Sequence, residues 1–242
     1  MTVVRLNKFL SELGYCSRRE ADKLIEQERV TVNGEIPQKG AKVSVSDEVV
    51  VDGEFVNKPK KLKERFVYIA FNKPRGIVCT TDAKNEKNNI IDYINHKKRI
   101  FPIGRLDKPS EGLIFLTSDG DIVNKILRSK NNHEKEYIVA VDRPIDNVFV
   151  KKMSDGIPIL GTKTKKCKVE KLGQYKFRIV LTEGMNRQIR RMCEHLEYKV
   201  KSLQRVRIMN VKLDIPLGQW RDLTPKEITE IKHLVSDSSK TR

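Results

Sequence analysis

The sequence predicts an α+β protein built from two domains, and three observations support this prediction. The chain has 242 residues, more than the roughly 100 to 200 residues typical of one domain. A basic, Pro-containing stretch at 57–65 separates a short segment from a longer one and is expected to be a linker. In the longer segment, strand and helix patterns mix without the strict alternation of a parallel α/β sheet.

Residues 1–60 are expected to form a small domain of two helices followed by strands. Apolar residues at helical spacing predict the first helix: Leu6, Phe9, Leu10 and Leu13. Ser17 and Glu20 have the spacing of a capping box, which predicts the start of the second helix. Val30–Gly34 carries a hairpin signal, and Val43–Val51 alternates as a further strand.

Two arginines, Arg18 and Arg19, lie in the first turn of the second predicted helix. The positive end of the helix dipole prefers acidic side chains, so two cations there are favourable if a phosphate joins them. The alternative is that both side chains extend into solvent. Because Arg5 and Lys8 are also nearby in the sequence, contact with an RNA backbone is the better interpretation.

The longer segment is predicted to contain a hairpin, three further strands and a helix near its end. The hairpin is expected over Tyr68–Cys79, with Lys73 and Arg75 at its bend. Strands are expected over Leu113–Leu116, Lys135–Val141 and Phe177–Thr182, and a helix over Asn186–His195.

Charge and composition indicate a polyanionic partner. The formal net charge is +17 and the sequence pI is about 9.7. No stretch approaches the ~18 apolar residues of a membrane span and no targeting pattern is present, so we expect a cytoplasmic protein without a membrane partner. The four cysteines are far apart, without a C-x-x-C pair, so we expect reduced thiols and no metal site.

Asp107 lies in a short charged loop between two apolar runs, in the segment R-I-F-P-I-G-R-L-D-K-P-S-E-G-L-I-F-L-T-S-D. Arg105 and Lys108 flank it, and nearby cations favour the ionised carboxylate that a nucleophile or a base requires. Taken alone, this local pattern favours an ordinary salt bridge in a loop.

The segment G-R-L-D, followed by G-L-x-x-L-T-x-D-G, resembles the central motif of the RsuA/RluB-type pseudouridine synthases. The resemblance implies that Asp107 is the catalytic carboxylate and that Arg105 fills the gap left when the target uridine leaves its stack. It also implies a reaction without a cofactor, in which the N1–C1′ bond breaks, the uracil rotates and C5 bonds to C1′. The carboxylate would attack C1′, add to C6 or remove the C2′ proton, and the sequence leaves all three open.

Two further motifs resemble those of the same family. H-E-K-E-Y ends at Tyr137, which by resemblance packs on the uracil; the alternative is a half-buried strand tyrosine. G-M-N-R-Q-I-R-R-M resembles the motif whose basic residue pairs with the aspartate, and by position this is Arg190. Arg187 and Arg191 share another helical face and are expected to bind RNA, as are Arg205 and Arg207. The alternative is that all three arginines of the motif form one solvated, RNA-facing run.

The resemblance extends over most of the chain. R-L-N-K-F-L, S-R-R-E-A-D-K-L-I and V-x-V-N-G resemble an alpha-L type RNA-binding module, expected over 1–60. N-R-Q-I-R-R-M-C-E-H and P-L-G-Q-W-R-D-L-T are most similar to the large-subunit synthases of type F within the family. We therefore expect a catalytic domain with a largely antiparallel sheet flanked by helices over 61–235, and a disordered tail over 236–242.

The resemblance implies a uridine of 23S ribosomal RNA as the substrate and a monomeric enzyme. Small-subunit ribosomal RNA and tRNA remain open as substrates of the same chemistry. A non-enzymatic factor for ribosome assembly would explain the charge and the N-terminal module equally well. It would not explain the combination of Asp107, Tyr137 and Arg190.

Overall fold

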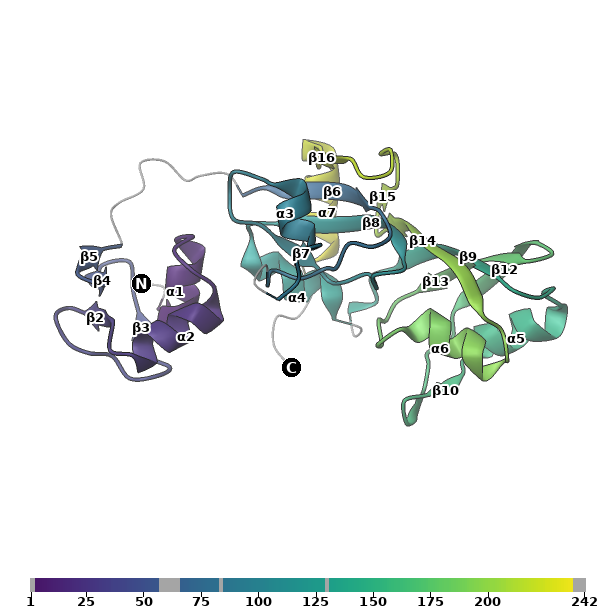
Figure 1. Ribbon diagram of the computed structural model, residues 1–242, viewed down its shortest axis with the longest axis horizontal. Helices are drawn as coiled ribbons and strands as arrows, with labels where there is room; N and C mark the ends of the chain where they lie inside the picture. Colours follow the sequence, from purple (N-terminus) through teal and green to yellow (C-terminus); the bar gives the residue numbers. More distant parts are fainter. Residues whose placement is uncertain (1–2, 57–65, 83–84, 129–130, 237–242) are drawn as a thin grey trace. The chain divides into compact units, whose positions relative to one another are not determined.

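The computed structural model describes residues 3–56, 66–82, 85–128 and 131–236. The chain divides into two compact units, Met1–Arg65 and Phe66–Arg242 (Figure 1). The predicted linker at 57–65 and residues 237–242 of the predicted tail lie outside the described residues. Ser236, the first residue of that tail, is described and donates its backbone amide to the carbonyl of His233.

Within its described residues, 3–56, the first unit contains two short helices and five short strands. Its elements are β1 (Val4–Arg5), α1 (Leu6–Glu12), α2 (Arg18–Glu26), β2 (Val30–Val32), β3 (Lys42–Val43), β4 (Val49–Val51) and β5 (Glu54–Phe55). β1 pairs with β3, and β2, β4 and β5 form a second antiparallel sheet. Apolar side chains from both helices and from β2, β3 and β4 form one core.

The start of α2 follows the predicted capping box. The Glu20 backbone amide donates to Ser17 Oγ at 3.1 Å, and the Ser17 amide donates to Glu20 Oε2 at 2.8 Å. This satisfies two of the amides that a helix N-terminus leaves unpaired.

The continuous strand predicted over Val43–Val51 is wrong, because a turn interrupts it. Ser44 donates its amide to Asp47 Oδ2 at 2.6 Å, and this side-chain acceptor replaces a strand partner. The predicted hairpin at Val30–Gly34 is also incomplete, because only Val32 and Glu35 bridge across its turn while β2 pairs with β4.

The second unit contains a nine-stranded mixed sheet. Its strands are β6 (Tyr68–Lys73), β7 (Phe101–Ile103), β8 (Glu111–Thr117), β9 (Lys135–Val141), β12 (Lys168–Gly173), β13 (Lys176–Leu181), β14 (Val200–Ile208), β15 (Val211–Lys212) and β16 (Trp220–Asp222). The order is β12-β13-β9-β14-β8-β6-β16, with β15 on β14 and β7 on β8. β14 and β8 are parallel, and the other pairs are antiparallel.

Helices cover both faces of the sheet at β6 and β8. The helices of this unit are α3 (Ile90–Ile94), α4 (Gly120–Leu127), α5 (Asn147–Asp155), α6 (Gln188–His195) and α7 (Pro225–Leu234), and β10 (Pro158–Ile159) and β11 (Thr162–Lys163) form a separate hairpin. Ile69 and Ile114 face a core with α3, α5 and α6, whereas Ala70 and Leu113 face a core with α4 and α7. Alternate residues of one strand therefore serve two cores, which explains why β6 and β8 are buried along nearly all of their length.

The predicted hairpin over Tyr68–Cys79 does not form. β6 ends at Lys73, but its partners are β8 and β16, and Val78 makes only an isolated parallel bridge with Asn89. The other expected elements are present with small changes at their ends, and Lys135–Val141 is reproduced in full. No helix of the described ranges is long and apolar enough to cross a membrane.

Candidate active site

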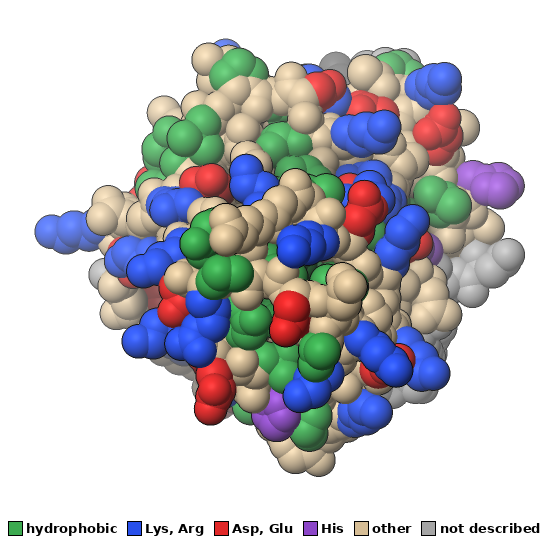
Figure 2. Space-filling view, turned by 90° about the vertical axis from the view of Figure 1, so that its right-hand side faces the viewer, with side chains coloured by type: hydrophobic (Ala, Val, Ile, Leu, Met, Phe, Trp, Pro, Cys, Tyr) green, Lys and Arg blue, Asp and Glu red, His purple; other side chains and the backbone are tan. Residues whose placement is uncertain are grey.

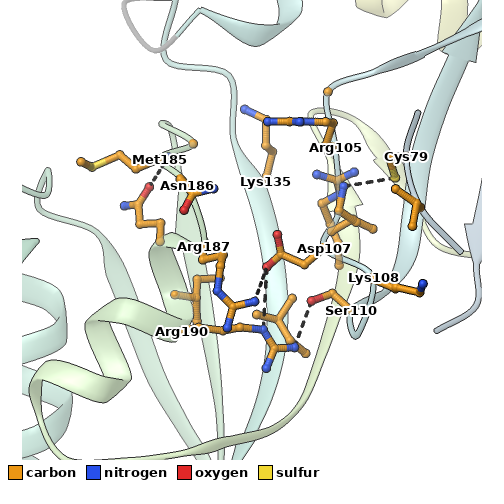
Figure 3. A pocket seen from close by; sticks show the side chains of 18 of the residues that line it. Cys79, Arg105, Asp107, Lys108, Ser110, Lys135, Met185, Asn186, Arg187 and Arg190 are labelled. Carbon is orange, nitrogen blue, oxygen red and sulfur yellow. Dashed lines mark hydrogen bonds and ion pairs between the residues drawn. The ribbon is translucent and has the colours of Figure 1, made fainter. Parts of the chain in front are cut away.

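A cavity of about 760 Å³ lies in the second unit, where the loop between β7 and β8 meets β9, β14 and the start of α6. Asp107, Tyr137 and Arg190 all line it. The structure therefore brings into one pocket three residues that lie up to 83 positions apart in the sequence. Figure 3 shows Asp107 pointing toward arginines of the opposite wall.

Asp107 lies in the β7–β8 loop with its carboxylate about one-third exposed, at 34%. Its backbone carbonyl accepts the Ser110 amide at 3.0 Å, which closes a tight turn after the aspartate. Arg190 Nε lies 3.8 Å and Arg187 Nη1 lies 3.9 Å from Asp107 Oδ2. Both distances exceed a hydrogen bond, so the carboxylate is attracted by two guanidinium groups without being locked by either.

Arg190 is buried on α6 and is held mainly by groups other than Asp107. Its Nη2 donates to Ser110 Oγ at 3.1 Å and to the Pro109 carbonyl at 3.4 Å, and Nη1 donates to the Val200 carbonyl at 3.5 Å. Nε, the atom nearest Asp107, has no hydrogen-bond acceptor in the described chain. Burial, and then the nearby Arg187, lower the pKa of Arg190.

Arg187 and Arg191 do not form one surface, in contrast to our prediction. Arg187 precedes α6 in a left-handed conformation, with φ of 51°, and its side chain reaches Asp107. Arg191 instead bonds back to Asn186, to its carbonyl at 3.1 Å and its Oδ1 at 3.2 Å. The helical spacing missed this because Arg187 lies outside the regular helix.

Tyr137 is buried on β9, beside Arg205 of the paired strand β14. The Arg205 guanidinium carbon lies 6.0 Å from the centre of the Tyr137 ring, at the outer limit of a cation–π contact. Arg205 is only 4% exposed and donates Nε to the Leu113 carbonyl at 2.6 Å. The prediction of Arg205 as a surface contact for RNA is therefore wrong; it lines the pocket wall.

Two other basic residues are also misplaced by the sequence prediction. Lys73 is fully buried, and its Nζ donates to the carbonyls of Pro74 and Ile77, both at 2.8 Å. Arg207 is held by Glu134 at 2.8 Å and by Glu136 at 2.9 Å. Neither side chain is available to a phosphate, because Lys73 is enclosed by the protein and Arg207 is neutralised by two glutamates.

The remaining predicted contacts are accessible. Arg105 is exposed and lines the pocket, and Arg75 is exposed with one bond to Glu111 at 3.0 Å. Arg18 and Arg19 are exposed in the first turn of α2, as expected.

Ser110 and Lys135 are among the pocket residues that the sequence prediction did not select as site residues. Ser110 is 1% exposed and bonds Arg190, and Lys135 is 7% exposed on the pocket wall. Burial, together with the neighbouring Arg205, lowers the pKa of Lys135 to about 8. The available signal was its spacing, since residues two apart on a strand share a face and Tyr137 follows Lys135 by two.

Comparison with known proteins agrees with this architecture. Residues 4–49 match the S4 domain family, and residues 67–195 match the RNA pseudouridylate synthase family. The "Dual-specificity RNA pseudouridine synthase RluF" of Escherichia coli strain K12 is 57% identical over 237 residues, covering 98% of this chain and 81% of the relative. The "Ribosomal large subunit pseudouridine synthase B" of Bacillus subtilis is 33% identical, covering 95% and 96%.

A solved structure supports the same conclusion. A "Crystal structure of pseudouridylate synthase" has a TM-score of 0.68 and 32% identity, and covers 96% of this chain and 99% of the other. The predicted α+β class and the predicted family resemblance are both confirmed. The chain belongs to the RNA pseudouridylate synthase family and is an isomerase that carries an S4 domain.

Proposed function

We propose that this enzyme isomerises a uridine of 23S ribosomal RNA, with Asp107 as the catalytic carboxylate. The observation that carries the proposal is the convergence of Asp107, Tyr137 and Arg190 on one cavity. Asp107 supplies the carboxylate, and the Tyr137 ring offers a flat surface for a uracil. Arg190 and Arg187 provide positive charge within 4 Å of the carboxylate.

The target uridine has to leave its stack to reach Asp107, because a duplex hides C1′ and C6. Unstacking costs on the order of a few kcal/mol, and Arg105 at the edge of the pocket is placed to fill the gap. Asp107 then attacks C1′, adds to C6 or removes the C2′ proton. The rearrangement conserves every atom and is redox-neutral, so it requires no cofactor.

Binding of the RNA backbone is assigned to the accessible basic residues. These are Arg18, Arg19, Arg75, Arg105, Arg187 and Arg191. Figure 2 shows Lys and Arg side chains spread over one face of the molecule, with Asp and Glu side chains between them. Phosphate contacts of this kind supply affinity and register without reading sequence.

The relatives support the choice of RNA. One relative carries the ribosomal large subunit in its name, and another, at 57% identity, is named for dual specificity. The first name supports 23S ribosomal RNA as the main substrate, and the second agrees with a further RNA substrate, for which we propose a tRNA. We also propose a monomeric enzyme of the cytoplasm.

Mapping of pseudouridine in total RNA tests the proposal. RNA from cells with the gene, without it, and complemented with Asp107→Asn is compared at every uridine. We expect a site in 23S RNA, and one in a tRNA, to be lost without the gene and not restored by the variant. A lost site confined to small-subunit RNA would contradict the assignment, as would restoration by Asp107→Asn.

A further inference from the structure

The wall of the pocket contains more positive charge than the reaction of Asp107 uses. Lys135 on β9 and Arg205 on the paired strand β14 both line the cavity, and Arg205 lies opposite Tyr137, two residues from Lys135. Lys135 is 7% exposed and Arg205 is 4% exposed. Buried cations normally have anionic partners, since removing a charge from water is costly.

Lys135 has no carboxylate partner among the described residues. Its Nζ donates to the backbone carbonyl of His133, at 3.3 Å, and the causes of its pKa shift include no acid. Arg205 similarly donates to a carbonyl, that of Leu113, and its Nη2 has no acceptor in the described chain. The carbonyl oxygens accept one hydrogen bond from each cation, but they carry no formal charge that would balance the two cations.

Acidic residues are close in sequence and are directed elsewhere. Glu134 and Glu136 flank Lys135, but strand alternation places them on the opposite face, where Arg207 binds both. The carboxylates that line the pocket have partners of their own: Arg187 and Arg190 face Asp107. Lys108 lies 3.8 Å from Glu86, Gln188 donates to Glu183, and Asn85 donates to Asp82. Among the described residues, no carboxylate forms an ion pair with Lys135 or Arg205.

We propose that Lys135 and Arg205 form an anion subsite that binds a phosphate group of the flipped target nucleotide. Figure 3 shows Lys135 and Asp107 in the same pocket, so a nucleotide whose sugar lies at Asp107 would bring a phosphate to this wall. Lys135 donates a charge-assisted hydrogen bond to the phosphate, and the positive charge of Arg205 on the paired strand attracts the same phosphate. The bound phosphate supplies the counter-charge that the protein lacks, and so helps to hold the nucleotide out of its stack.

The inference rests on the proposed function, because it concerns the same pocket. Equilibrium dialysis of the full chain with radiolabelled uridine, uridine 5′-monophosphate and uridine 3′-monophosphate tests it independently of turnover. We expect one nucleotide to bind at least about tenfold more tightly than uridine, the size of a hydrogen bond to a charged group. The preferred isomer identifies which phosphate is bound.

Lys135→Met should abolish this preference, whereas Lys176→Met, at an exposed lysine of β13, should keep it. Because methionine removes a buried cation without a carboxylate partner, the melting temperature should stay equal or rise. A fall of more than about 4 °C would make Lys135 a structural residue and overturn the proposal.

Three binding results would also overturn it. These are equal affinity of the wild type for uridine and both nucleotides, no measurable binding of any of the three, and a preference that survives in Lys135→Met. Displacement of the nucleotide by inorganic phosphate as effective as by the unlabelled nucleotide would indicate a free-phosphate site instead. Tritium release from C5-labelled ribosomal RNA, measured in parallel, reports the proposed function separately, so failure of the subsite and failure of the function remain distinct.

Discussion

At the scale of single residues, Asp107 combines a partly exposed carboxylate with a backbone fixed by the turn to Ser110. Asp107→Asn removes the charge and keeps the shape, so the fold and RNA binding should persist. Tritium release from C5-labelled uridine in RNA should fall on the order of a thousandfold, about 4 kcal/mol of barrier. The control is Asp82→Asn, an exposed acid on the same pocket, which should stay near wild type. Turnover of Asp107→Asn within about tenfold of wild type would leave Asp107 as a loop salt bridge.

Ser110 positions the guanidinium that faces Asp107, through a buried bond of 3.1 Å to Arg190 Nη2. Ser110→Ala should lower kcat roughly ten- to a hundredfold with little change in KM, because a bond to a charged group is removed. Ser110→Thr keeps the hydroxyl and should restore most of the turnover. In a double-mutant cycle, Ser110→Ala and Arg190→Gln should be non-additive in kcat. Full activity of Ser110→Ala would assign the positioning of Arg190 to the carbonyls of Pro109 and Val200 alone.

At the scale of elements, the first turn of α2 presents Arg18 and Arg19 to solvent at the positive end of the helix dipole. Arg18→Ala and Arg19→Ala should each reduce the log–log salt slope of RNA binding by about 0.7 to 0.9 for every phosphate that the variant no longer neutralises. The matched control is Arg29→Ala, because Asp52 already pairs Arg29 at 2.6 Å in the same unit. An unchanged salt slope of RNA binding in the variant that carries both Arg18→Ala and Arg19→Ala would mean that this helix end does not contact RNA phosphates.

The start of α7 is tied to β16 by Arg221, which bonds Glu227 at 2.8 Å and also binds Asp214. The Arg221 guanidinium, more than the Thr224 cap, holds the pKa of Glu227 at about 2, against an ordinary value of 4.5. Because the pKa of Glu227 is lower in the folded state than in the unfolded state, the ionised carboxylate stabilises the fold at pH values above about 4.5. This stabilisation is lost as the pH falls from about 4.5 to about 2. Thermal melts of wild type should show that loss, and Glu227→Gln should flatten it and melt lower at pH 7. If the melting temperature of Glu227→Gln fell with pH in parallel with that of the wild type, Glu227 would not be the source of the pH dependence.

At the scale of the whole molecule, patterns within one element predicted the structure better than pairings between elements. The capping box of α2 and the alternation of Lys135–Val141 depend on near neighbours, and both are present. Alternation shows that a strand has two faces, but it does not show what lies opposite each face. Arg205 and Arg207 were therefore both expected on the surface, although β14 places one in the pocket and the other against two glutamates.

The candidate site shows the same limit. Three sequence motifs identified Asp107, Tyr137 and Arg190 as candidate site residues. The burial of Lys73, which rules it out as an RNA contact, follows only from the position of β6 between β8 and β16. The link from Arg190 to Ser110 spans 80 positions of the chain, and no local pattern reveals such a bond.

The parallel pairing of β14 with β8 has a mechanical consequence. It joins two halves of one sheet, and the proposed catalytic residues are divided between them: Tyr137 belongs to the half with β14, whereas the Asp107 loop leads into β8. The join has only two registered pairs, one of them Arg205 with Gly112. Gly112 has a φ of +105°, and a Cβ built there would lie 2.3 Å from the Arg205 carbonyl oxygen.

Gly112→Ala would therefore spread the two halves and move Asp107 away from Tyr137, without altering either side chain. We expect turnover to fall by more than tenfold, whereas RNA affinity should fall less, because most of the proposed phosphate contacts lie outside the join and only Arg205 lies in it. Stability should fall as well, because the added Cβ strains the sheet at its centre. If Gly112→Ala kept full turnover, the two halves would be shown to tolerate displacement. A loss of turnover would show that the β14–β8 pairing sets the distance between Asp107 and Tyr137.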